Sequence, residues 1–108
     1  MIPDEVTISP EVFSPDNDGV DDVLNINYRF DTPSLMGEVI VFDSSGRIVR
    51  RLVNRQLLAA EGTITWDGAD DRGRKAITGV YIIYFHVYNS NGIQKVYKIP
   101  AVLASKRN

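Results

Sequence analysis

The sequence contains no cysteine. This absence excludes disulfide scaffolds, zinc sites built on thiolates and thiol-dependent catalysis. No apolar run approaches the ~18 residues that a membrane-spanning helix requires. The N-terminal stretch MIPDEVTISP has neither the basic region nor the long apolar segment of a signal peptide. The sequence therefore predicts no membrane span and no export leader within these residues.

Clustered positive charge is also missing. The 12 lysines and arginines are spread along the chain and are outnumbered by 14 acidic residues, for a net charge of −2. Binding to nucleic acid requires grouped cations that displace counterions from phosphates, and an anionic membrane would require a polybasic segment. Neither partner is expected. The length of 108 residues and the hydrophobic fraction of 44% fit one soluble globular domain, which we expect to be a monomeric module.

Histidine occurs once, at position 86. Nucleophilic catalysis needs a nucleophile, a base that activates it and a group that orients the base. His86 lies between Phe85 and Val87, and no G-x-S-x-G elbow is present. We interpret His86 as an ordinary strand residue and expect no catalytic residues and no enzyme activity.

Apolar residues recur at every second position along most of the chain, which is the period of a β-strand. The stretch 23–30 places Leu24, Ile26, Tyr28 and Phe30 on one face. The stretch 79–89 has one fully apolar face and one mixed face. Further strands are expected at 5–9, 38–43, 48–53, 62–66 and 93–103, with Pro100 at an edge or bulge because it cannot donate to a ladder.

Turn residues separate these stretches. Gly46 lies in SSGR (44–47), and NSNG (89–92) joins the last two strands. The segment 51–62 is the only one with a helical character, and we interpret it as a strand end followed by a loop. About seven short strands with such turns predict an all-β fold, an antiparallel immunoglobulin-like β-sandwich over residues 1–108.

The stretch SPDNDGVDD (14–22) is the strongest candidate metal site. Calcium prefers several oxygen ligands from closely spaced acidic and amide side chains, with a glycine that permits the sharp turn. Against an EF-hand loop with Gly19 at its sixth position, the first acid is replaced by Ser14 and the terminal glutamate by Asn25. The alternatives are a calcium site and a loop held by its own backbone hydrogen bonds. The candidate calcium ligands are Asp16, Asp18, Asp21 and Asp22.

A second acidic cluster, DGADD (67–71), contains Asp67, Asp70 and Asp71. A glycosidase would need two carboxylates at a defined separation across a cleft. A small sandwich with short connections has little room for such a cleft. We therefore interpret these aspartates as turn residues whose side chains accept backbone N–H bonds.

Three motifs follow one another along the chain. The first is VFSPDNDGVDDVLNINY (12–28), the second VIVFDSSGRIVRRL (39–52) and the third TWDGADDRGRKAITGVYIIYFHV (65–87). In this order they resemble the immunoglobulin-like domain at the C-terminus of flagellar hook-capping proteins. They resemble still more the gliding-motility-associated modules that act as type IX secretion sorting domains in exported Bacteroidetes proteins.

The motif residues have plain structural interpretations. Phe42 and Trp66 are expected to fill the core, where large aromatic side chains contribute most. Gly46 would close the first hairpin, Asp67 and Gly68 would turn the chain after a strand, and Gly79 would let the long strand containing Tyr81 begin tightly.

The resemblance implies a non-catalytic C-terminal sorting, anchoring or interaction module of a larger exported protein, located at the cell surface or outside the cell. Its partners would be protein components of the secretion machinery or surface. We expect that machinery to contact the strand at 93–103 and the basic ending Lys106 and Arg107. The alternative is a calcium-stabilised sandwich that binds carbohydrate or another ligand, with Tyr84 and Tyr88 stacking on sugars.

Overall fold

The computed structural model describes residues 4–15, 22–32 and 34–104. These residues form eight strands and no helix. The strands are β1 (Glu5–Ser9), β2 (Val12–Phe13), β3 (Leu24–Arg29), β4 (Met36–Asp43), β5 (Ile48–Leu57), β6 (Glu61–Trp66), β7 (Gly79–Tyr88) and β8 (Gln94–Leu103).

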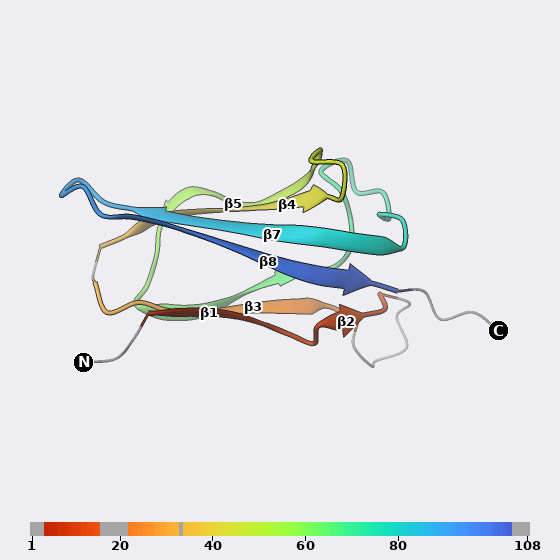
Figure 1. Ribbon diagram of the computed structural model, residues 1–108, viewed down its shortest axis with the longest axis horizontal. Coiled ribbons are helices and arrows are strands. Elements are labelled where there is room, and N and C mark those ends of the chain that lie inside the picture. Colours follow the sequence, from red (N-terminus) through yellow and green to blue (C-terminus); the bar gives the residue numbers. More distant parts are fainter. Residues whose placement is uncertain (1–3, 16–21, 33, 105–108) are drawn as a thin grey trace.

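The strands form two sheets that face each other (Figure 1). One has three strands in the order β1-β3-β6, and the other has five in the order β2-β8-β7-β4-β5. All pairs are antiparallel except β2 with β8, where Val12 and Phe13 run parallel to Val102 and Leu103. The predicted β-sandwich is therefore confirmed. The short parallel pair was not predicted, because two residues carry no periodic signal.

The core lies between the sheets and follows the two-residue period of the strands. Leu24 and Ile26 face inward from β3, and all four residues of the apolar face of β7 are buried. Phe30 lies 5.9 Å from Phe85, ring centre to ring centre. The faces predicted for 23–30 and 79–89 are confirmed.

The prediction that Phe42 lies in the core is wrong. It is half-buried and lies outside the core, on the outer face of the five-stranded sheet, where its ring meets Tyr84 edge-on at 5.8 Å. The reason is the strand period: Val39 and Val41 occupy the inward positions of β4 and are fully buried, so the next residue points outward. The prediction that Trp66 is a core residue is confirmed, since its side chain is fully buried.

Two hairpins have the predicted turns. In the β4–β5 turn, the Asp43 Oδ1 accepts the N–H groups of Ser45 and Arg47 at 2.9 and 3.0 Å, and Gly46 has φ of 89°. In the β7–β8 turn, the Asn89 Oδ1 accepts two backbone N–H groups in the same way. Both turns use a side-chain oxygen to satisfy backbone donors that the ladder leaves free.

Strand β8 is an edge strand over most of its length. The two residues of β2 pair only with its last two residues, so Pro100 lies where no described strand adjoins the outer side of β8. This confirms the edge position predicted for Pro100. The segment 51–62 also follows the prediction: β5 continues to Leu57, and a short connection leads to β6.

Candidate interaction site

The three sequence motifs meet at one end of the sandwich. Phe13 of the first motif packs on Trp66 of the third, with ring centres 5.3 Å apart, and Trp66 packs on Tyr81 at the same separation. Pro15 lies against Gly68: a Cβ built on Gly68 would come within 2.9 Å of the Pro15 Cγ. Gly68 also has φ of 83°, a conformation that favours glycine. The first and third motifs are therefore neighbours in space although they are far apart in sequence.

The loop after β6 is held by its own side chains. The Trp66 Nε1 donates to the Ala69 carbonyl at 2.8 Å, and the Asp67 Oδ1 accepts the Ala69 N–H at 3.0 Å. The Asp70 Oδ1 accepts the N–H groups of Arg72 and Arg74, both at 2.9 Å. These contacts are the turn chemistry predicted for Asp67 and Asp70.

The same loop is fastened to the edge of β5. The Asp71 N–H donates to the Val49 carbonyl at 3.0 Å, and the Asp71 Oδ1 accepts the Arg51 N–H at 3.0 Å. The Arg50 side chain donates to the Asp70 carbonyl at 3.2 Å. The loop thus covers part of an edge strand that would otherwise offer free backbone groups, and it is held in one position relative to β5.

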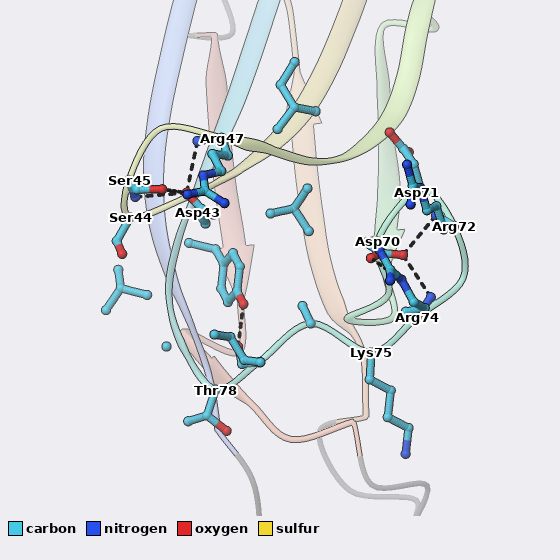
Figure 2. A pocket seen from close by; sticks show the side chains of 17 residues that line it. Asp43, Ser44, Ser45, Arg47, Asp70, Asp71, Arg72, Arg74, Lys75 and Thr78 are labelled. Atoms are coloured by element: carbon cyan, nitrogen blue, oxygen red, sulfur yellow. Dashed lines mark hydrogen bonds and ion pairs between the residues drawn. The ribbon is translucent and has the colours of Figure 1, made fainter.

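A groove of about 730 Å³ lies between the β4–β5 turn and the segment 70–81. Figure 2 shows Asp43, Ser45 and Arg47 on one side of it, and Asp70 with Arg72 and Arg74 on the other. The second motif therefore supplies one wall and the third motif supplies the other. We call this the motif groove.

Apolar side chains are exposed in the motif groove. Ile77 is 81% exposed, Val80 47% and Ile48 44%. Folding does not bury these side chains, and large apolar residues gathered at one surface site are typical of a contact with a partner.

The Asp43 and Asp70 carboxylates of the groove already accept hydrogen bonds from neighbouring backbone N–H groups. The hydrogen bond from the Arg74 backbone N–H is the largest cause that holds the pKa of Asp70 below its ordinary value. Burial opposes it in part, and the hydrogen bond from the Arg72 N–H adds to it. The Ser45 hydroxyl and the Arg47 N–H do the same for the pKa of Asp43. The Asp70 carboxylate also lies 3.4 Å from the Arg74 guanidinium.

Most of the positively charged side chains of the groove have no ion-pair partner among the described residues. Within the described part of the chain, Arg47, Arg72 and Lys75 form no ion pair. They line the groove together with the exposed apolar side chains and with Asp43, Asp70 and Asp71, in a protein whose net charge is −2.

Tyr81 connects the core to the groove. Its ring is buried beside Trp66, and its hydroxyl donates to the Ile77 carbonyl. Burial, and then the nearby charge of Asp43, raise the pKa of this phenol above its ordinary value. The sequence indicated the apolar side of Tyr81, whereas its hydrogen bond to the loop follows only from the tertiary structure.

Gly79 begins β7 in open surroundings. A Cβ built on it would meet no heavy atom within 4 Å. Close packing therefore does not explain this glycine, contrary to the tight start expected for the strand.

His86 has the cross-strand role expected of a strand histidine. Its Nδ1 lies 3.1 Å from the Oε1 of Glu38, its register partner on β4, and the other oxygen of Glu38 lies 3.7 Å from the Arg55 Nε. Tyr84 and Tyr88 flank His86 on the outer face of the sheet, with ring centres 6.2 and 5.1 Å away. The rings tilt against each other by 47° and 31°. These tyrosines pack against His86, and their stacking on sugars stays a prediction.

Part of the candidate set lies outside the described residues. This applies to Asp16, Asp18 and Asp21 of the candidate calcium site and to Lys106 and Arg107. Asp22 is described and has an interaction partner. Among the residues that the structure describes, no group of three or more histidine or acidic side chains is placed to hold a metal. The calcium hypothesis for the acidic loop stays a prediction.

Comparison with known proteins decides the family. The CHU_C type IX secretion signal domain model matches residues 7–100. The chain belongs to the type IX secretion signal domain family. This confirms the resemblance to sorting modules that the three motifs indicated. No curated protein matches the chain significantly.

Among solved structures, the crystal structure of CopC from Methylosinus trichosporium OB3b is similar to this domain with a TM-score of 0.60. The match covers 98% of both chains at 14% sequence identity. At this identity the similarity concerns the fold alone, and it agrees with the observed sandwich. Within the described residues, the search for a helix with the length and apolar character needed to cross a membrane found none.

Proposed function

We propose that this domain is the non-catalytic sorting module of an exported protein, and that the type IX secretion machinery recognises it as a folded β-sandwich. The observation that carries the proposal is the family match over residues 7–100. A secretion signal domain belongs to a secreted or cell-surface protein, and its partners are components of the secretion machinery.

The roles of the motif residues support recognition of a folded surface. Trp66 and Tyr81 pack in the core, Gly68 permits a close contact with Pro15, and Asp43 and Asp70 stabilise turns through backbone hydrogen bonds. Together these residues fix the surface geometry at one end of the sandwich. A signal of this kind would be read from surface geometry, so its loss on unfolding is expected.

A reporter fusion tests the proposal. Residues 1–108 are joined to the C-terminus of a reporter that carries its own inner-membrane export signal, in a host with a working type IX system and in a matched host without it. The reporter should reach the surface or medium only in the competent host. Retention in both hosts would contradict the proposal.

A second variant tests recognition of the folded state. Trp66→Ala removes a fully buried side chain and should unfold a large fraction of the domain. The same fusion with Trp66→Ala should be retained in the competent host. Secretion at the level of the unchanged domain would show that a linear signal is read and would contradict recognition of the fold.

A further inference from the structure

We propose that the motif groove binds an extended acidic peptide segment with an apolar anchor side chain, contributed by a protein partner. The inference rests on the proposed function only for the source of this peptide, which would be the secretion machinery. The groove is bounded by the β4–β5 turn and the segment 70–81.

The apolar part of the groove indicates the anchor. Ile77 is 81% exposed, and Ile48 and Val80, which line the same groove, are each nearly half exposed. Covering such side chains removes apolar surface from water, which is the main favourable term in most protein association. One aliphatic or aromatic side chain of a partner placed among these three would supply the buried centre that a binding site usually contains.

The charge around the groove indicates an acidic partner. Arg47, Arg72 and Lys75 form no ion pair within the described residues, whereas the Asp70 carboxylate already has Arg74 and two backbone N–H groups. Carboxylates on either side of the anchor would meet these cations and complement the rim.

The mixture of charges disfavours a polyanion as the occupant. Asp43, Asp70 and Asp71 line the groove together with the cations. A nucleic acid or other continuous polyanion would approach these carboxylates along its whole length, while a peptide can place its few acidic groups only where cations lie.

The walls are already held in position. Asp71 is hydrogen-bonded to both Val49 and Arg51 of β5, and Tyr81 holds the Ile77 carbonyl. A site that is ordered before binding loses less conformational entropy when the ligand arrives. The groove is therefore suited to accept a segment that becomes ordered on binding.

Fluorescence anisotropy with the purified domain tests the inference. The probe is a fluorescein-labelled octapeptide of alternating glutamate and leucine. One control peptide carries glutamine in place of glutamate, and a second carries serine in place of leucine. We expect saturable binding of the probe, and this binding should weaken when the ionic strength rises from about 0.05 to about 0.5 M. Both control peptides should bind at least roughly tenfold more weakly than the probe.

Three variants assign the binding to the groove. The double substitution Arg72→Glu with Lys75→Glu and the single substitution Ile77→Ser change exposed side chains, and each should weaken probe binding roughly tenfold or more. Arg29→Glu is the matched control, because it reverses one exposed charge on β3 of the other sheet, and it should leave binding unchanged. A circular dichroism melt confirms that all variants are folded.

Each remaining outcome would overturn the inference. Absence of saturable binding would do so, as would equal binding by all variants. If Arg72→Glu with Lys75→Glu weakens probe binding and Ile77→Ser does not, the groove binds a purely anionic ligand in place of a peptide. In the reporter assay, secretion by the unchanged domain together with full secretion by the groove variants would remove the groove from sorting while leaving the proposed function intact.

Discussion

The ring of Pro15 lies against Gly68, so close that a Cβ on the glycine would sit 2.9 Å from the Pro15 Cγ. This contact joins the first motif to the third, 53 positions apart in the sequence. It also explains why the third motif has a glycine there: the φ of 83° and the nearby ring both disfavour a side chain.

Gly68→Ala should therefore destabilise the domain by more than its backbone conformation alone requires. Gly73→Ala is the matched control, because Gly73 has a similar φ of 81° and a Cβ there would meet nothing within 4 Å. Forcing a residue with a Cβ into this conformation costs roughly 1–2 kcal/mol, and the overlap with Pro15 should add roughly 1–3 kcal/mol for Gly68→Ala alone. Urea denaturation of both variants measures the difference, and equal losses would show that Pro15 simply moves aside.

The outward position of Phe42 has a consequence for stability. Phe85→Ala empties a fully buried core position and should cost roughly 3–5 kcal/mol. Phe42→Ala removes a half-buried ring whose neighbour is Tyr84, and it should cost less than half as much. Thermal and urea unfolding measure the free energy of unfolding of the two variants. If Phe42→Ala lowers it as much as Phe85→Ala does, Phe42 contributes to stability as a core residue would.

Acid should destabilise the domain through three aspartates. Hydrogen bonds from the Asp31 N–H and then Lys95 lower the pKa of Asp4, and the contacts described above lower the pKa values of Asp43 and Asp70 from an ordinary value of 3.8. A carboxyl whose pKa is lower in the folded state than in the unfolded state stabilises the fold above the unfolded value and loses this effect as the pH falls through the folded one. The urea midpoint should therefore be steady near neutral pH and fall below about pH 4.

Asp70→Asn isolates one of these groups. Asparagine keeps a side-chain oxygen that can accept the Arg72 and Arg74 N–H groups but does not titrate in this range. The urea midpoint of the variant should fall less steeply below about pH 4 than that of the unchanged domain. An identical slope would show that Asp70 does not contribute to the acid sensitivity.

Calcium binding by the acidic loop has a direct test. A ligand that binds only the native state raises its stability in proportion to the logarithm of its concentration. The calcium hypothesis predicts that the melting midpoint rises between chelator and millimolar calcium, and that Asp16→Asn with Asp18→Asn removes this rise. An unchanged midpoint would leave the loop as a segment held by protein contacts alone.

The basic ending provides a separate test of what the machinery reads. Lys106→Ala with Arg107→Ala in the reporter fusion should reduce secretion if the ending is contacted, while leaving the melting midpoint of the domain unchanged. Comparison with the Arg72→Glu and Lys75→Glu variant shows whether the ending, the motif groove or both are needed. Full secretion with the alanine pair would exclude the ending.

Much of the fold could be predicted because its signals are local. The alternation around Ile26 and Ile83 defines strands and their buried faces, and the turns at Gly46 and Gly92 join neighbouring strands into hairpins. The three motifs in order were enough to indicate the family, since each is a short stretch whose spacing can be seen in one sequence.

The face of Phe42 could not be predicted in this way. Both faces of β4 carry large apolar side chains, so alternation alone does not say which face is inward. The choice is made by the neighbours: β4 lies between β7 and β5, and the register that buries Val39 opposite Phe85 places Phe42 opposite Ile82 on the outer face. Pairing between distant strands settled a question that the local pattern left open.

The sequence by itself determined every strand except β2, the hairpins, the structural use of aspartate and glycine in the turns, and the family. Only the tertiary structure brought the three motifs to one end of the sandwich and formed the motif groove between the second and third. The physical reason is that the groove depends on long-range contacts, such as Asp71 with Val49 and Pro15 with Gly68, which join segments that no local period relates. Ile77 and Lys75 are unremarkable loop residues in the sequence, and folding places them on the rim of a site.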